Sequence, residues 1–86
     1  MNINELIAIV KNKLEKEIII QDLKIEDKSF LHKNHKAHQE GKFHLKLMIN
    51  SKELAKSSKI VSTKRIYGIL DLELKEHIHS IQILLN

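Results

Sequence analysis

The stretch from Phe43 to Asn50, Phe-His-Leu-Lys-Leu-Met-Ile-Asn, decides the fold of this chain. Its residues Phe43, Leu45, Leu47 and Ile49 place an apolar side chain at every second position. Successive side chains of a β-strand point to opposite faces, so a period of two is the signature of a strand. We therefore expect residues 43–50 to form a strand.

Upstream of this strand the sequence predicts a helix, another strand and a long loop. Apolar residues recur at helical spacing from Asn2 to about Lys16, and Glu5 completes the form of a capping box with Asn2. Residues 18–26 are first β-branched and then alternate apolar with charged side chains, which is typical of a strand. Residues 27–41 show no apolar periodicity, and loops of this length in a compact domain are often functional.

Downstream the sequence predicts a turn, a second helix and a third strand. We expect the turn over residues 51–56 and the helix over roughly 57–75, with Ser57 or Ser58 as its N-cap. The residues at helical spacing on the expected buried face are Ile60, Thr63, Tyr67, Leu70 and Leu74. The third strand covers residues 78–85, where the residues of one parity are His79, Ile81, Ile83 and Leu85.

The order helix-strand-strand-helix-strand predicts an α+β fold in one domain spanning residues 1–86. The first two strands can pair antiparallel, and a helical crossover joins the second strand to a parallel third strand. Two helices on one face of this three-stranded mixed sheet would cover the core. In this topology the end of the first strand and the starts of the other two meet at one edge. We therefore expect His79 to lie beside the 27–41 loop.

Composition restricts the class of protein. The chain of 86 residues carries 42% hydrophobic and 30% charged residues, a globular balance. It lacks cysteine, which excludes disulfides, thiol nucleophiles and an iron–sulfur cluster held by its own thiolates. No apolar run is long enough for a membrane span, and no signal peptide is visible, so we expect a soluble cytoplasmic protein. No nucleophile–base pair or glycine-rich phosphate loop is present, so we do not expect an enzyme.

Histidines are the residues best suited to binding chemistry. His32, His35 and His38 recur at a spacing of three within the predicted loop, and neutral imidazole is the commonest metal ligand in proteins. The alternatives are a solvated loop and a simple zinc or nickel site made by these three side chains. For His79 the alternative is a partly buried side chain bonded to a backbone carbonyl. His44 is expected on the polar face of its strand, and no site role is assigned to it.

Several segments together resemble a known family. Asp27, Ser29, His32 and His35 form D-x-S-x-x-H-x-x-H, and Gly41-Lys42-Phe43-His44-Leu45 stands where BolA proteins have Gly-x-Ser-His-Phe. Ile66-Tyr67 matches the end of the family's Arg-His-Arg-x-Val-Tyr motif, and Ile78-His79-Ser80-Ile81 resembles its Ile-His-Ala-Leu. The chain departs from the family in the helix motif, where Arg-His-Arg has become Ser62-Thr63-Lys64.

The resemblance to BolA proteins implies a fold similar to class II KH domains and a partner. That partner is a monothiol glutaredoxin, with which family members share a bridging 2Fe–2S cluster. The resemblance assigns one ligand to His79 and a second to His32, with His35 and His38 as alternates. The glutaredoxin cysteine and glutathione would supply the thiolates. We accordingly expect no cofactor in the isolated chain, which would be a monomer alone and a heterodimer with glutaredoxin.

The resemblance also implies a second possible function, that of a nucleic-acid-binding transcriptional regulator, and the charge distribution supports it. Between Lys28 and Arg65 ten basic residues face two acidic ones, a net charge of +8. The sequence lacks the G-x-x-G loop of KH domains and has few aromatic residues for stacking, so binding would be driven by phosphate contacts. The candidate contacts around the second helix are Lys52, Lys56, Lys59, Lys64 and Arg65.

Overall fold

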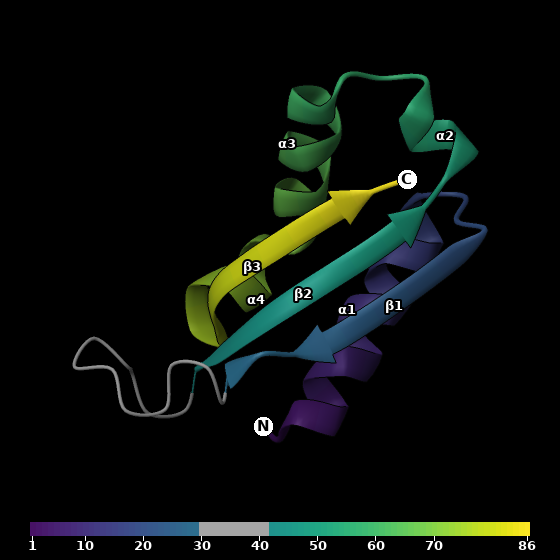
Figure 1. Ribbon diagram of the computed structural model, residues 1–86. Coiled ribbons are helices and arrows are strands. Elements are labelled where there is room, and N and C mark those ends of the chain that lie inside the picture. Colours follow the sequence, from purple (N-terminus) through teal and green to yellow (C-terminus); the bar gives the residue numbers. More distant parts are fainter. Residues whose placement is uncertain (30–41) are drawn as a thin grey trace.

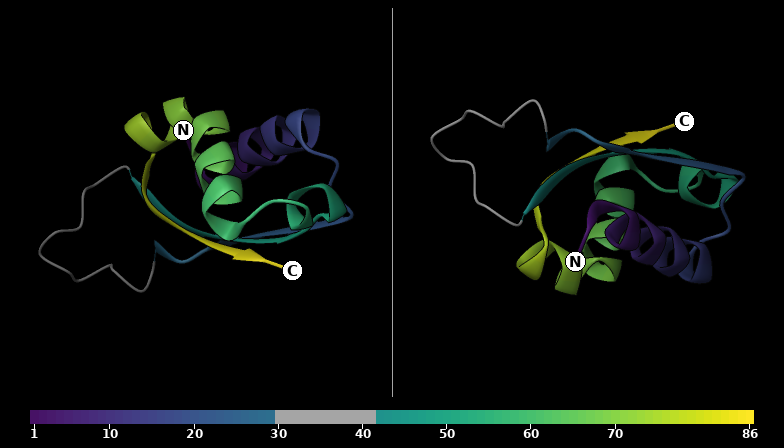
Figure 2. Two further views of the ribbon diagram at one scale, coloured as in Figure 1. Left: turned by 90° about the horizontal axis from the view of Figure 1, so that it is seen from above. Right: turned by 90° about the horizontal axis from the view of Figure 1, so that it is seen from below.

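A three-stranded mixed sheet carries all the helices on one of its faces in the computed structural model, which describes residues 1–29 and 42–86 (Figures 1 and 2). This is the predicted α+β class. The elements follow the chain in the order α1 (Ile3–Glu17), β1 (Asp22–Asp27), β2 (Phe43–Asn50), α2 (Lys52–Ala55), α3 (Lys59–Ile69), α4 (Asp71–Glu76) and β3 (Ile78–Leu85). No helix within the described ranges has the length and apolar character needed to cross a membrane.

The strand order is β1-β2-β3, with β2 in the centre (Figure 1). β1 pairs antiparallel with β2, and β3 pairs parallel with β2. The end of β1 and the starts of β2 and β3 therefore meet at the same end of the sheet, as the sequence predicts. We call this the histidine end, and define it by Ser29, His44, His79 and Ser80.

The core lies between the sheet and the helices. The side chains of Leu45, Leu47 and Ile49 are at most 2% exposed, which confirms the burial pattern of the central strand. Helix α1 covers them with a stripe at helical spacing, and the C-terminal half contributes further aliphatic side chains. Those outside β2 that are no more than 2% exposed are Leu6, Val10, Leu14, Ile18, Ile66, Leu70 and Ile78.

Helix starts are fixed by side-chain caps. The predicted capping box is present, since the Glu5 N–H donates to Asn2 Oδ1 over 2.8 Å and Asn2 Nδ2 donates to Glu5 Oε1 over 2.9 Å. Of the two candidate serines, Ser58 caps α3 by accepting the Val61 N–H at 3.2 Å. Ser51 caps α2 in the same way and also donates to the Ile19 carbonyl, which ties α2 to the segment after α1.

Three of the predicted elements differ from the structure in their boundaries. The first strand begins at Asp22 rather than at residue 18, because the Ile18 N–H still bonds the Leu14 carbonyl and its side chain is buried in the core. The turn predicted over residues 51–56 contains the short helix α2, and the long helix predicted over 57–75 divides at Leu70 into α3 and α4.

The buried face of the second helix also differs from the prediction. Ile60 and Tyr67 are 70% and 42% exposed, whereas Ser62 and Ile66 are buried. Ser62 faces inward because its hydroxyl donates to the Leu54 carbonyl of α2 over 3.2 Å. This polar contact rotates the helix relative to a purely apolar pattern, since hydropathy does not register a satisfied buried serine.

Candidate functional site

A β-bulge at the start of β3 shapes the histidine end. Phe43 pairs with Ile78 and the next residue, His44, pairs with Ser80, so His79 is an extra residue on β3. A bulge re-aims the side chain it carries. His79 is exposed rather than partly buried beside Ile81, and its predicted shared parity with that residue is wrong for this reason.

The bulge brings His79 against His44. His79 Nδ1 lies 3.3 Å from His44 Nε2, which is hydrogen-bonding distance between two ring nitrogens. The ring centroids are 4.8 Å apart and the planes are inclined by 61°. His44 is only 5% exposed, so its predicted place on a polar face does not leave it in solvent. The sequence reasoning gave His44 no role; the parallel pairing of β2 with β3 is the signal that places it beside His79.

His44 is held by its neighbours on both sides. Its Nδ1 lies 2.6 Å from Ser80 Oγ, and its backbone N–H donates to Ser29 Oγ over 3.0 Å. The Lys28 N–H donates to the His44 carbonyl over 2.7 Å, and the Ser29 N–H donates to Asp27 Oδ1. The backbone leaving β1 is thus fastened to the start of β2.

The other candidate ligands, His32, His35 and His38, lie outside the described residues. Both described flanks of their segment meet the histidine end: Ser29 bonds His44, and Lys42 precedes Phe43, whose N–H donates to the His77 carbonyl. The proximity of His32, His35 and His38 to His79 stays a prediction. Within residues 1–29 and 42–86, no group of three or more His, Cys, Asp or Glu side chains could hold a metal ion.

A depression of about 360 Å³ lies beside the histidine pair, between residues of β2 and β3 that include His44 and Ser80. Figure 2 shows the course of these two strands. Among the described residues, the lining of the depression includes Lys28 and Lys46 together with His44 and has no acidic side chain. Lys28 Nζ also lies 3.8 Å from the carboxylate of Glu26, which partly offsets the positive charge of the lysine. The local charge favours an anionic guest over a bare divalent cation.

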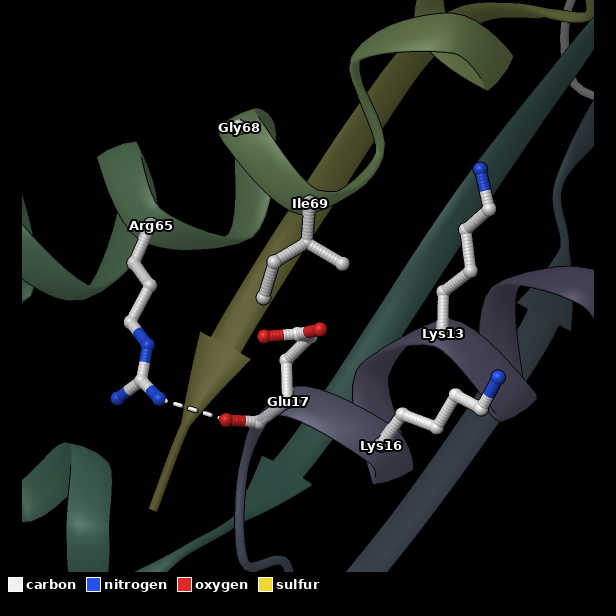
Figure 3. A pocket seen from close by; sticks show the side chains of 6 residues that line it. All are labelled: Lys13, Lys16, Glu17, Arg65, Gly68 and Ile69. Atoms are coloured by element: carbon white, nitrogen blue, oxygen red, sulfur yellow. Dashed lines mark hydrogen bonds between the residues drawn. The ribbon is translucent and has the colours of Figure 1, made fainter.

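The basic residues of the alternative function are spread over α2 and α3. Lys52, Lys56, Lys59 and Lys64 are exposed. Arg65, in contrast, has its guanidinium engaged, because it forms an ion pair with Glu53 and donates from Nη2 to the Glu17 carbonyl over 2.7 Å (Figure 3). Four of the five predicted cations therefore project into solvent, and the fifth joins α3 to the ends of α1 and α2.

Arg65 also borders a groove of about 470 Å³ between α1 and α3, lined by Lys13, Lys16, Glu17, Arg65, Gly68 and Ile69 (Figure 3). Its positive charge is largely compensated, since Lys13 pairs with Glu73 and Glu17 is itself in the lining. Glu53 belongs to the same network: the Ile19 N–H and the Arg65 side chain hold the pKa of its carboxyl below the ordinary value.

Comparisons with known proteins show the family and agree with the fold. The sequence matches the BolA-like protein family over residues 14–86. The BolA domain of SufE1 from Arabidopsis thaliana superposes with a TM-score of 0.78 at 28% identity, covering 100% of this chain and 93% of that one. BolA1 from the same plant gives 0.78 at 27% identity, covering 92% and 87%. Mouse BolA1 shares the fold, with a TM-score of 0.71 at 19% identity over 90% of this chain and 60% of that one. No curated protein sequence matches the chain significantly.

Proposed function

Because the chain belongs to the BolA-like protein family, we propose that it is a non-enzymatic partner of a monothiol glutaredoxin and shares a bridging 2Fe–2S cluster with it. The observation that carries the proposal is the placement of His79. It stands on a bulge with Nδ1 against His44, while its Nε2 has no hydrogen-bond partner among the described residues. An exposed ring nitrogen with this freedom is suited to coordinate a metal held by another protein.

The donor chemistry supports a shared cluster. The chain has six histidines and no cysteine, so it can offer imidazoles but not the thiolates that an iron–sulfur cluster needs on its other iron. His79 would provide one ligand and His32 the second, with His35 and His38 as alternates. The cysteine of the glutaredoxin and glutathione would complete the set. Imidazole in place of thiolate raises the reduction potential of such a cluster.

Local charge supports the same guest. Glutathione carries carboxylates, so a cluster ligated by glutathione would bring anionic groups to this place, and the described residues that line the depression beside His44 include two lysines and no acid. The same lysines disfavour a free divalent cation at this place. A zinc or nickel ion held by His32, His35 and His38 is the competing occupant. Metal analysis of the purified, tag-free chain distinguishes the two, because a shared cluster leaves the isolated chain without metal.

The test is to mix the chain with a cluster-loaded monothiol glutaredoxin and record its visible absorption and circular dichroism. We expect the wild-type chain to change the spectrum, His79→Ala to abolish the change, and His77→Ala to retain it. His77 is the matched control, since the Glu76 carboxylate, 3.7 Å from Nε2, is the one polar partner of its side chain among the described residues. A spectrum that stays identical to that of glutaredoxin alone with every variant contradicts the proposal.

A further inference from the structure

We propose that His44 is a positioning residue for His79: it accepts a hydrogen bond from Nδ1 and so holds the Nε2 lone pair outward, toward the incoming metal. The role in metal binding rests on the function proposed above, whereas the contact between His44 and His79 is present in the chain without any partner. His44 would touch neither the cluster nor the partner, and its effect would pass through the ring of His79.

The first step of the argument is geometric. The two nitrogens of an imidazole lie on different edges of the ring, so fixing Nδ1 at 3.3 Å from His44 Nε2 turns the Nε2 of His79 away from His44. Histidines that bind metals almost always donate their other ring N–H to an acceptor, which fixes tautomer and orientation. Carboxylates, carbonyls and waters are the usual acceptors, whereas here a second imidazole takes that place.

The second step concerns rigidity. His79 is exposed and stands on a bulge, where little packing restricts its side-chain rotation. His44 is 5% exposed and is fixed by Ser29 through its backbone N–H and by Ser80 through Nδ1. The exposed ring of His79 is therefore in contact with the buried ring of His44, which its neighbours hold in place. Holding a ligand in place before binding reduces the entropy lost when it coordinates.

The third step concerns protons. When His79 Nδ1–H donates to His44 Nε2, a neutral His44 carries its own proton on Nδ1 and donates it to Ser80 Oγ, 2.6 Å away. His79 Nε2 is then unprotonated and can coordinate. The reverse arrangement, with His44 Nε2–H donating to His79 Nδ1, places the proton of His79 on Nε2 and blocks it. The two arrangements carry the same number of protons, so coordination selects between tautomers.

The test uses the free chain with ¹⁵N-labelled histidine, at a pH where both imidazoles are neutral. Ring ¹⁵N shifts report which nitrogen of His79 is protonated. We expect a higher share of the Nδ1–H tautomer in the wild type than in His44→Leu, which removes the acceptor at similar volume. His44→Gln, whose side-chain carbonyl can accept, should restore much of it, and Ser80→Ala should lower it. An unchanged His79 tautomer in all three variants overturns the proposal.

A second readout links positioning to binding. Loss of the supporting contact should weaken the response to cluster-loaded glutaredoxin by about 10- to 100-fold in affinity, as for other groups that orient metal ligands, and His44→Gln should recover most of it. A His44→Leu chain that fails to fold leaves Ser80→Ala and His44→Gln to decide. If the wild type does not change the glutaredoxin spectrum, the proposed function fails and the tautomer measurement still decides the positioning. If it does and the tautomers are unaffected, only the positioning fails.

Discussion

Replacing Lys13 with Met should destabilise the fold far more than an exposed lysine would suggest. Lys13 Nζ lies 2.7 Å from Glu73 Oε2, and the side chains are 38% and 5% exposed. Glu73 Oε1 is buried and has no hydrogen-bond partner among the described residues. Lys13 is thus the one described charge partner of a carboxylate that has been removed from water.

The magnitude follows from that asymmetry. Breaking a buried ion pair by removing one partner costs about 3–5 kcal/mol, against about 0–1 kcal/mol for an exposed pair. Because Lys13 is partly solvated, we expect the lower end for Lys13→Met, about 3 kcal/mol, or a fall in Tm of roughly 12–24 °C. Glu73→Leu removes the buried charge together with its unsatisfied oxygen, so its cost should be close to zero.

Urea unfolding followed by far-ultraviolet circular dichroism measures both variants, and an unchanged m-value shows that the midpoints report stability. The decisive comparison is Lys13→Met in a Glu73→Leu background, where no carboxylate is left without its partner. There the cost of losing Lys13 should fall below about 1 kcal/mol. Equal costs of Lys13→Met in the two backgrounds would refute the reasoning, since the lysine would then act through packing alone.

Three further predictions concern the core, the Glu53 network and the basic surface. Leu47→Ala removes a fully buried side chain from the central strand and should cost about 2–5 kcal/mol in urea unfolding; a smaller loss would show that the site collapses around the smaller side chain. The pKa of Glu53 is lowered from its ordinary 4.5, so its stabilising contribution is complete above that value and is lost as the pH falls through the folded pKa. Glu53→Gln should therefore lower stability at neutral pH and converge with the wild type in acid; parallel pH curves would contradict this. Nucleic-acid binding through Lys52, Lys59 and Lys64 should disappear in gel shifts at physiological salt, and a sequence-specific shift that persists there would favour the regulatory function.

The sequence predicted the topology because the pattern of the central strand and the helical segment after it favour the arrangement that the structure shows. Phe43, Leu45, Leu47 and Ile49 require a strand with a buried face, and the helical crossover after it requires a parallel neighbour. From these followed the meeting of three strand ends at one end of the sheet, where His79 lies at the start of β3. The Asn2 and Ser58 caps could also be predicted, because each accepts a hydrogen bond from a backbone N–H only three residues away.

What the sequence could not provide depends on contacts between distant residues. The inward turn of Ser62 depends on the Leu54 carbonyl, and the exposure of His79 depends on a register shift between two strands. Neither leaves a trace in local hydropathy. His44 was given no role because its contacts with Ser29, Ser80 and His79 join distant parts of the chain, which alternation along one strand cannot reveal. The ligand role of the histidines at 32, 35 and 38 remains a prediction.

The bulge at position 79 also means that the side chain at this position is not part of the packing between β3 and the core. Because the bulge accommodates one extra residue, Ile81, Ile83 and Leu85 pack against the core whatever side chain stands at position 79. Substitution of the exposed His79 should therefore cost little folding stability. If His79 binds a metal as proposed, that function could be changed or lost by substitution at this position while the domain stays folded.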